Sequence, residues 1–431
     1  MMYRKIVFAL LFMPLWAWGA VPVADNDTTP EALHSLGLNY LTGNDLLGIY
    51  MNKEKGVELI HRAAERGHAQ AQYNLGVCYS NGQGVAQDYA QAVYWYRKSA
   101  EQGYALAQYN LGVCYANGQG VVQDYERAVY WCRQAAEQGH AWAQNDLGVC
   151  YDNGQGVSQD YAQAVYWYHK SAEQGHAQGQ YNLGVCYANG QGVAQDYAQA
   201  VYWYRKSAEQ GHTWAQNNLG RSYYEGEGVT QDYAQAVYWY RKSAEQGNVS
   251  AQNNLGVCYA NGEGVTQDYA QAVYWWRQAA EQGNAMVQYK LGICYFNGRG
   301  VAQDYAQAVY WWRQAAEQGD VLAQYNLGRF YGFSQEGQND YSQAIHWLSL
   351  AGEQGHADSQ LALAILYSGR KDYKQSVYWC RLAAEQGNPK AQYFLGLCYG
   401  AGNGVRTNPK KARYWKNLAF QNGYRPTNNN R

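Results

Sequence analysis

The stretch that decides the fold is residues 71–103, AQYNLGVCYSNGQGVAQDYAQAVYWYRKSAEQG. It recurs nearly verbatim along the chain. The leucine that precedes a glycine, here called the repeat leucine, returns every 36 residues, at Leu75, Leu111, Leu147, Leu183, Leu219, Leu255, Leu291 and Leu327. Leu363 continues the step with Ala364 in place of glycine, Leu395 follows after 32 residues, and Leu36 precedes Leu75 by 39. We therefore count eleven copies between residues 29 and 423, because similarity at a fixed period identifies a repeat architecture.

One copy, residues 105–139, predicts two helices. Ala107 and Leu111 lie four residues apart, on one face of a first helix over 105–116 that an Asn-Gly pair ends. Asp124 is a candidate N-cap for a second helix over 125–138. A single helical hairpin cannot cover its own apolar face, whereas stacked neighbours can. The sequence therefore predicts an all-α solenoid of about eleven two-helix repeats.

The repeated motifs resemble those of a known family. Ala-x-x-x-Leu-Gly-x-x-Tyr, Gly-x-Gly-Val, Asp-Tyr-x-x-Ala and Trp-Tyr-x-x-Ala-Ala-Glu-x-Gly are similar to the Sel-one-like repeats (SLR), relatives of the tetratricopeptide repeats. The resemblance implies a right-handed superhelix that serves as a scaffold or adaptor for protein–protein interaction, and it does not imply an enzyme. The copy of Leu327 loses its glycine connector at 333–338, the copy of Leu363 shortens it to 368–371, and the first copy has a three-residue insertion and Leu59 in place of Trp. We expect less regular packing there.

The composition of the chain limits the classes of partner that it is expected to bind. The 431 residues carry a formal net charge of −1, with 16% charged and 47% hydrophobic residues. A chain without basic excess is a poor match for nucleic acid or an anionic membrane as its main partner. The apolar content argues against disorder. We expect a monomer that binds a protein or peptide and needs no cofactor.

The N-terminus has the three parts of a secretory signal peptide. Arg4 and Lys5 precede an apolar run over 6–16, and small residues favour cleavage between Gly19 and Ala20. The run is shorter than the ~20 residues that span a bilayer, so we expect no transmembrane segment. The predicted organisation is a signal peptide (1–19), a linker (20–28), the solenoid (29–423) and a tail (424–431), in a periplasmic or secreted protein.

Repetition also argues against an active site, because catalysis needs a unique set of groups. Glu101, Glu209 and Glu281 belong to a glutamate that recurs in every Ala-Glu-Gln-Gly. Pairs such as Gly82-x-Gly84 lack the Lys-Ser/Thr ending of a phosphate loop and are predicted to be turn glycines. The Ser-x-x-Lys pattern at 368–371 lacks the companion motifs of penicillin-binding enzymes.

Histidines recur just after the glycine that ends a second helix, at His68, His140, His176, His212 and His356. Stacked helices lie ~10 Å apart, whereas zinc needs ligands at ~2 Å. We expect exposed turn histidines and no metal site.

Seven of the nine cysteines stand three residues after a repeat leucine, at Cys78, Cys114, Cys150, Cys186, Cys258, Cys294 and Cys398. Cys132 and Cys380 lie on second helices, each 18 residues before a cysteine of that series, so Cys132–Cys150 and Cys380–Cys398 could be bridged. Cys114 competes for Cys132, being also 18 residues away. The alternative is that all nine are small buried apolar residues. Many SLR proteins of this compartment staple their helices with disulfides, but their usual cysteine at the end of the second helix is absent here, where the chain has Ala100, Ala136 and Ala172.

The copies also differ, and four offsets from the repeat leucine vary most: −5, −2, +2 and +5, all on the first helix. In the tetratricopeptide relatives this face lines the concave groove. Several copies place large apolar, aromatic or Arg side chains there, which are common interface anchors. The predicted partner-binding residues are Trp142, Asn145, Asp152, Trp214, Asn217, Arg221, Tyr224, Met286, Tyr289, Phe296 and Arg329.

Two other functions remain open at this point. A long solenoid without a specific ligand would be a structural spacer of the envelope. An enzyme acting on β-lactams or cell wall is the weaker alternative, because no unique polar cluster exists. Some secreted SLR proteins of bacteria act on host cells, which the resemblance allows here.

Overall fold

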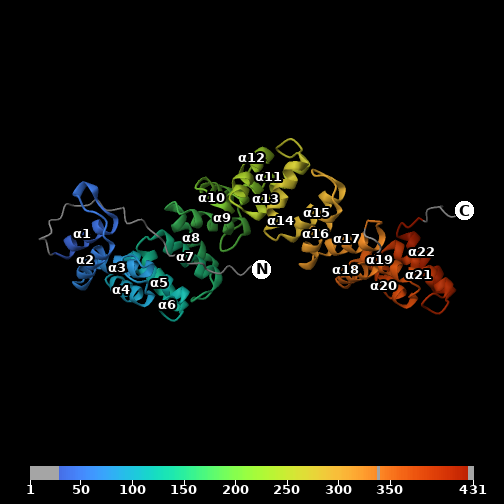
Figure 1. Cartoon of the computed structure of the whole chain (residues 1–431), viewed down its shortest axis with the longest axis horizontal. Coiled ribbons are helices and arrows are strands. Elements are labelled where there is room, and N and C mark those ends of the chain that lie inside the picture. Colours follow the sequence, from blue (N-terminus) through green and yellow to red (C-terminus); the bar gives the residue numbers. More distant parts are fainter. Residues whose placement is uncertain (1–28, 337–339, 426–431) are drawn as a thin grey trace. The chain divides into compact units, whose positions relative to one another are not determined.

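The computed structural model describes residues 29–336 and 340–425. The predicted signal peptide, the linker 20–28 and tail residues 426–431 lie outside them. The chain forms two compact units, residues 1–231 and 232–431, each described here by itself. Within the described ranges unit 1 contains α1–α11 and unit 2 contains α12–α22 (Figure 1). The boundary falls inside one copy, between α11 and α12.

First and second helices alternate, and each has 13 residues. The first helices are α1 (Pro30–Thr42), α3 (Ala69–Asn81), α5 (Ala105–Asn117), α7 (Ala141–Asn153), α9 (Ala177–Asn189), α11 (Thr213–Glu225), α13 (Val249–Asn261), α15 (Ala285–Asn297), α17 (Val321–Phe333), α19 (Ala357–Gly369) and α21 (Pro389–Ala401). The second helices are α2 (Lys53–Glu65), α4 (Tyr89–Glu101), α6 (Tyr125–Glu137), α8 (Tyr161–Glu173), α10 (Tyr197–Glu209), α12 (Tyr233–Glu245), α14 (Tyr269–Glu281), α16 (Tyr305–Glu317), α18 (Tyr341–Glu353), α20 (Tyr373–Glu385) and α22 (Pro409–Gln421). The predicted all-α fold is confirmed.

The predicted caps set the helix ends. Asp124 accepts a hydrogen bond from the Arg127 amide at 3.0 Å and starts α6. Gly118 ends α5 in the left-handed conformation, with φ of 67°. Gly120 has φ of 70°, and a Cβ there would collide with the Tyr89 carbonyl of the preceding second helix. The Gly-x-Gly connector is thus required for a turn and for close packing.

The repeat leucines form the centre of the core. The eight with 36-residue spacing, Leu75 to Leu327, have no exposed surface. The following glycine lets the two helices of a hairpin approach: a Cβ on Gly76 would lie 2.6 Å from the Tyr96 ring. The predicted inner face of α6 is also buried, at Ala128, Cys132 and Ala135. The structure therefore confirms the face on which the sequence placed the core.

A buried glutamine clamp, which sequence analysis did not anticipate, joins neighbouring copies. Gln144 of α7 donates to the Ala136 carbonyl at the end of α6, at 3.0 Å. Its side-chain oxygen accepts from Gln174, after the end of α8, at 2.7 Å. The same clamp forms around Gln72, Gln108, Gln180, Gln252, Gln288, Gln324, Gln360 and Gln392. It satisfies a buried helix-end carbonyl, which explains why both glutamines recur.

The irregular copies adapt locally. The insertion of the first copy forms a short 3₁₀ helix, Asp45–Leu47, and Leu59 is buried in place of Trp. The shortened connector after α19 is a tight turn in which Lys371 adopts φ of 62°, the single positive φ outside glycine in the described residues. Val121, the valine that follows the Gly-x-Gly connector of its copy, is half-buried. Within 29–336 and 340–425, no helix has the length and apolarity to cross a bilayer.

Candidate functional site

Two of the four variable offsets are open to solvent in some of the copies, although Val113 at offset +2 is fully buried. At offset −5, Trp214 is 52% exposed and Met286 is 56% exposed. At offset +2, Arg221 and Arg329 are exposed. Because −5 and +2 are seven residues apart, they lie on one face of a helix. We call this face, defined by offsets −5 and +2 of the first helices and taken within each unit by itself, the first-helix stripe.

Offset −2 is not part of an open groove, which corrects the sequence-based expectation. Asn145 and Asn217 are buried, and Tyr289 is half-buried. The side chain at −2 instead meets offset −1 of the next copy. Asn182 donates to Asn145 at 2.9 Å, and Lys290 donates to Asn253 at 3.0 Å. Offset −2 therefore belongs to the seam between neighbouring first helices.

One carboxylate interrupts this seam of amides. Asp146, at offset −1 of α7, accepts from the Tyr109 hydroxyl at 3.0 Å and from the Asn145 amide at 3.0 Å. Burial of its carboxylate raises the pKa of Asp146 to about 6. The two donors favour the charged form and limit that rise.

Offset +5 faces the second helix of the same hairpin, a second correction. The Tyr168 hydroxyl of α8 donates to Asp152 at 3.4 Å. Phe296 packs against Trp312 of α16, with ring centroids 5.3 Å apart. Tyr224 is half-buried. Offsets −2 and +5 share a line that is rotated by about 60° from the line of −5 and +2, which suffices to turn them into the packed side.

The recurring histidines are structural N-caps rather than exposed turn residues, a third correction. His176 accepts from the Gly179 amide at 3.2 Å and starts α9. Trp142 stacks on the His176 ring at 4.4 Å, and Tyr109 stacks on His140 at 4.8 Å. Burial lowers the pKa of His140, His176 and His212 to about 4. The neutral rings of His140, His176 and His212 each contact an aromatic side chain of the preceding first helix.

The stacking makes Trp142 half-buried, so it contributes less open surface than Trp214. Sequence reasoning missed three members of the first-helix stripe in unit 2. Leu322 is 47%, Ile365 45% and Leu397 41% exposed, on α17, α19 and α21. Their signal was present in the sequence, because Leu322 occupies offset −5 of its copy, and Ile365 and Leu397 occupy offset +2 in the copies of Leu363 and Leu395. First helices α17 and α19 are in direct contact.

The charges of the stripe are mostly cationic. The Arg329 guanidinium lies 5.5 Å from the centre of the Tyr325 ring, on the same helix. In the described part of the chain, neither Arg221 nor Arg329 forms a salt bridge. Lys390 is exposed, and Asp358 accepts from Asn388 at 2.9 Å. The stripe thus offers apolar side chains flanked by guanidinium groups that are available to a partner.

The cysteines are all buried free thiols in this structure, so neither predicted bridge is formed in it. Cys132 lies in one buried cluster with both Cys150 and its competitor Cys114, and Cys380 lies in another with Cys398. The Cys380 thiol donates to the Ala391 carbonyl at 3.2 Å. Burial raises the pKa of all four thiols. Pairing under oxidising conditions stays a prediction.

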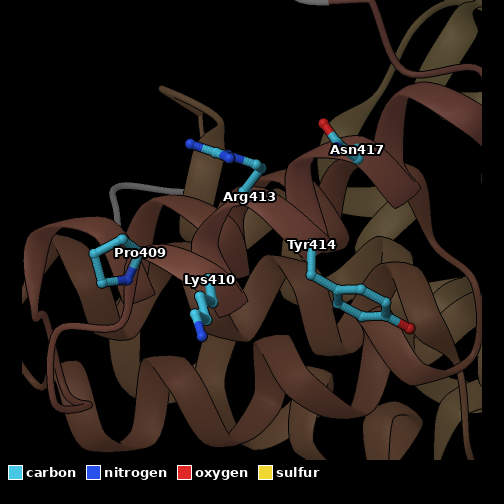
Figure 2. A pocket seen from close by; sticks show the side chains of 5 residues that line it. All are labelled: Pro409, Lys410, Arg413, Tyr414 and Asn417. Carbon is cyan, nitrogen blue, oxygen red and sulfur yellow. The ribbon is translucent and has the colours of Figure 1, made fainter.

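No metal-binding cluster of three or more His, Cys, Asp or Glu side chains occurs among residues 29–336 and 340–425. A shallow pocket of about 360 Å³ lies on α22, away from the first helices (Figure 2). Its lining residues are Pro409, Lys410, Arg413, Tyr414 and Asn417.

Comparison with known proteins places these features in a family context. The family model described as "Sel1 repeat" matches eleven consecutive segments that together extend from residue 30 to residue 424. One similar solved structure is c5321, described as a protective antigen present in uropathogenic Escherichia coli strains displaying an SLR fold. It is 40% identical, with a TM-score of 0.78, and the match covers 91% of this chain and 86% of that chain. A Sel1 repeat protein from Oxalobacter formigenes is 34% identical, with a TM-score of 0.55 over 68% of this chain and 84% of that chain. A search of curated proteins gives no match.

Proposed function

The chain belongs to the Sel1 repeat family, and from that premise we propose that it is a non-catalytic scaffold that binds a protein or peptide along its first-helix stripe. Solenoids of this family generally act as scaffolds for protein interaction and generally lack catalytic activity. The partner and the binding face are the parts that we add.

The observation that carries the proposal is the exposure of large side chains at offsets where other copies have small or polar residues. Trp214 and Met286 are about half exposed, whereas the same offset holds Gln178 and Ser250 in other copies. Drift at a solvated position would favour small polar residues. Aromatic, Met and Arg side chains are instead enriched at protein interfaces.

The stripe suits an extended peptide or a helix of the partner. On α11, Trp214 and Arg221 lie on one face, two turns apart. On α17, Leu322 and Arg329 repeat that arrangement with an aliphatic anchor. Apolar anchors supply affinity, and charged groups set the register of a bound segment. An acidic or amide-rich segment with apolar residues is the ligand that this chemistry favours.

We also propose that the protein acts outside the cytoplasm. The support is the basic, apolar and small-residue pattern of residues 1–19. The E. coli relative is described as a protective antigen, and an antigen is a molecule that the immune system of a host meets. A role toward a host cell is compatible with both observations.

Pulldown with the purified chain, from envelope extract and from host-cell lysate, tests the binding face. We expect Trp214→Ala combined with Arg221→Ala to abolish capture of the partner, because cutting a buried anchor to Ala commonly costs at least about 2 kcal/mol of binding. Both side chains are exposed in the free chain, so helicity and melting temperature should stay nearly unchanged.

Lys206→Ala is the control, because Lys206 is exposed on a second helix, α10. It should leave capture intact. If capture survives the double substitution and fails with Lys206→Ala, the partner uses the second helices and the proposed face is wrong.

A further inference from the structure

The end of the chain has a charge that the overall composition conceals. After Glu385 there are eight Lys or Arg residues and no Asp or Glu. The preceding 385 residues carry the other 25 basic residues and all 34 acidic ones. The near-neutral total is therefore the sum of an acidic chain and a basic end.

The basic residues gather on α22, the last second helix. Lys410 and Arg413 are exposed and line the shallow pocket beside Tyr414 and Asn417 (Figure 2). Lys416 lies against the adjacent first helix, with its ammonium 5.9 Å from the centre of the Tyr393 ring. In the described residues none of these cations forms a salt bridge. We call Lys410, Arg413, Tyr414, Asn417 and Phe420 the α22 surface.

The α22 surface differs from every other second helix in the positions that stack on a following copy. Arg413 replaces a valine that is buried elsewhere, as Val377 is in α20. Phe420 replaces a fully packed alanine, such as Ala384, and is 47% exposed. Tyr414 is 60% exposed, but this is a feature that α22 shares with other second helices, in which the same position is also exposed, as at Tyr378 (54%).

A terminal repeat needs a polar outer face for solubility, and mixed charges would provide one. The solubility of an end cap does not explain charges of a single sign, nor the exposed Phe420 ring.

We propose that the α22 surface docks on an anionic, phosphate-bearing lipid surface. Clusters of Lys and Arg on an amphipathic helix are attracted to anionic headgroups. Aromatic rings such as Tyr414 and Phe420 favour the boundary between headgroups and acyl chains. Charge complementarity supports this occupant, because the exposed Lys410 and Arg413 match anionic headgroups and α22 contains no carboxylate. A second copy of the chain, whose first 385 residues are acidic, is the competing occupant, and the test below distinguishes the two.

This docking is peripheral and independent of the partner-binding stripe. The sequence-based expectation that an anionic membrane is not the main partner rested on the net charge of the whole chain. The basic charge of α22 alone permits a local contact with such a membrane.

The test is co-sedimentation of the full chain with two kinds of vesicle. One is pure phosphatidylcholine, and the other is phosphatidylcholine with one quarter phosphatidylglycerol. We expect binding to the anionic vesicles alone, weakened by salt. Lys410→Glu combined with Arg413→Glu should lower the partition coefficient at least about tenfold, because each cation near the surface is worth about 1 kcal/mol. Phe420→Ser should lower it less and leave its salt dependence unchanged.

Lys170→Glu combined with Lys206→Glu is the matched control, because it makes the same change in net charge at exposed sites of α8 and α10. It should retain binding. If circular dichroism shows that the variant with Lys410→Glu and Arg413→Glu has lost helical structure, the variant with Lys410→Gln and Arg413→Gln is used in its place. Equal binding of the chain to both vesicles, or equal loss in the control, overturns the proposal. So does a surface that binds only duplex DNA, or that only dimerises the chain.

Discussion

Leu183 shows how one residue holds a copy together. Its side chain is fully enclosed by α9, α10 and their neighbours, and the glycine after it admits the Tyr204 ring of α10. Leu322 is the same residue type on another first helix, yet it is 47% exposed. The difference lies only in the offset from the repeat leucine.

Leu183→Ala should lower the free energy of unfolding by about 2–5 kcal/mol, since it removes buried contacts and leaves a cavity. Leu322→Ala should change it by no more than about 0.5 kcal/mol, as is usual for surface positions. Urea unfolding followed by circular dichroism measures both. If Leu183→Ala lowers the free energy of unfolding by less than about 0.5 kcal/mol, the value usual for surface positions, the assigned core face is wrong.

The cysteines allow a second prediction at this scale. Because all nine are buried and burial raises the pKa of thiols such as Cys78 and Cys114, the folded protein should resist alkylation by iodoacetamide. Unfolding should expose nine reactive thiols in protein made under reducing conditions. In protein made in an oxidising compartment, we expect seven, with Cys380 joined to Cys398. Mass spectrometry of non-reduced peptides reads the pairing, and nine free thiols would end the disulfide hypothesis.

At the scale of the helix, the N-cap residue of a first helix determines whether the stability of that helix depends on pH in the acid range. His140, His176 and His212 cap their helices through an unprotonated ring nitrogen. The copies of α13, α15 and α21 use Asn248, Asn284 and Asn388 in the same place. The chain thus contains two equivalent caps that differ in whether they titrate.

The free energy that these capping histidines contribute to folding should be fully present above about pH 6.5, the ordinary pKa of histidine in an unfolded chain. It should be lost as the pH falls toward 4. Burial lowers the folded-state pKa of all three rings to about 4, so the unfolded chain binds protons first. Changing the three to Asn should make stability less dependent on pH in this window, by on the order of 1–3 kcal/mol for each residue. Burial raises the pKa of Asp146 to about 6, so this residue makes the folded state more stable as the pH falls. Its contribution is the same in the unchanged chain and in the triple variant, and it therefore cancels when the two pH profiles are compared. Identical pH profiles would contradict the capping role.

At the scale of the whole molecule, stability should be distributed along each unit. Inside unit 1 a helix contacts its hairpin partner, the adjoining copy and few others. The hydrogen-bonded glutamine clamp joins each copy to the next and no further. A solenoid of this kind is a sum of units and nearest-neighbour interfaces.

Leu183→Ala should therefore speed amide hydrogen exchange first in α9 and α10, then in α7, α8 and α11, and least in α1 and α2. Leu75→Ala should reverse the order, with α3 and α4 affected first. Hydrogen exchange resolved by peptide mass spectrometry reads both gradients. A uniform rise across α1–α11 would show that unit 1 opens as one body.

The sequence by itself determined the number of copies, the helix type, the helix ends and the buried leucines. Each of these follows from a local pattern: a 36-residue period, apolar spacing, Asp before a helix and Gly after it. Because the copies can be compared with one another, the sequence alone also shows which positions of the repeat vary.

Only the tertiary structure decided which variable offsets are open. Offsets −2 and +5 vary as much as −5 and +2, but neighbouring helices cover them, as at Asn145 and Phe296. A rotation of about 60° around a helix separates an open from a covered line, and the sequence does not contain the angle at which helices pack. The same reason hid the glutamine clamp and the histidine stacking, because each partner lies on another helix. The exposure of Arg413 and Phe420 on α22 is likewise visible only in the structure.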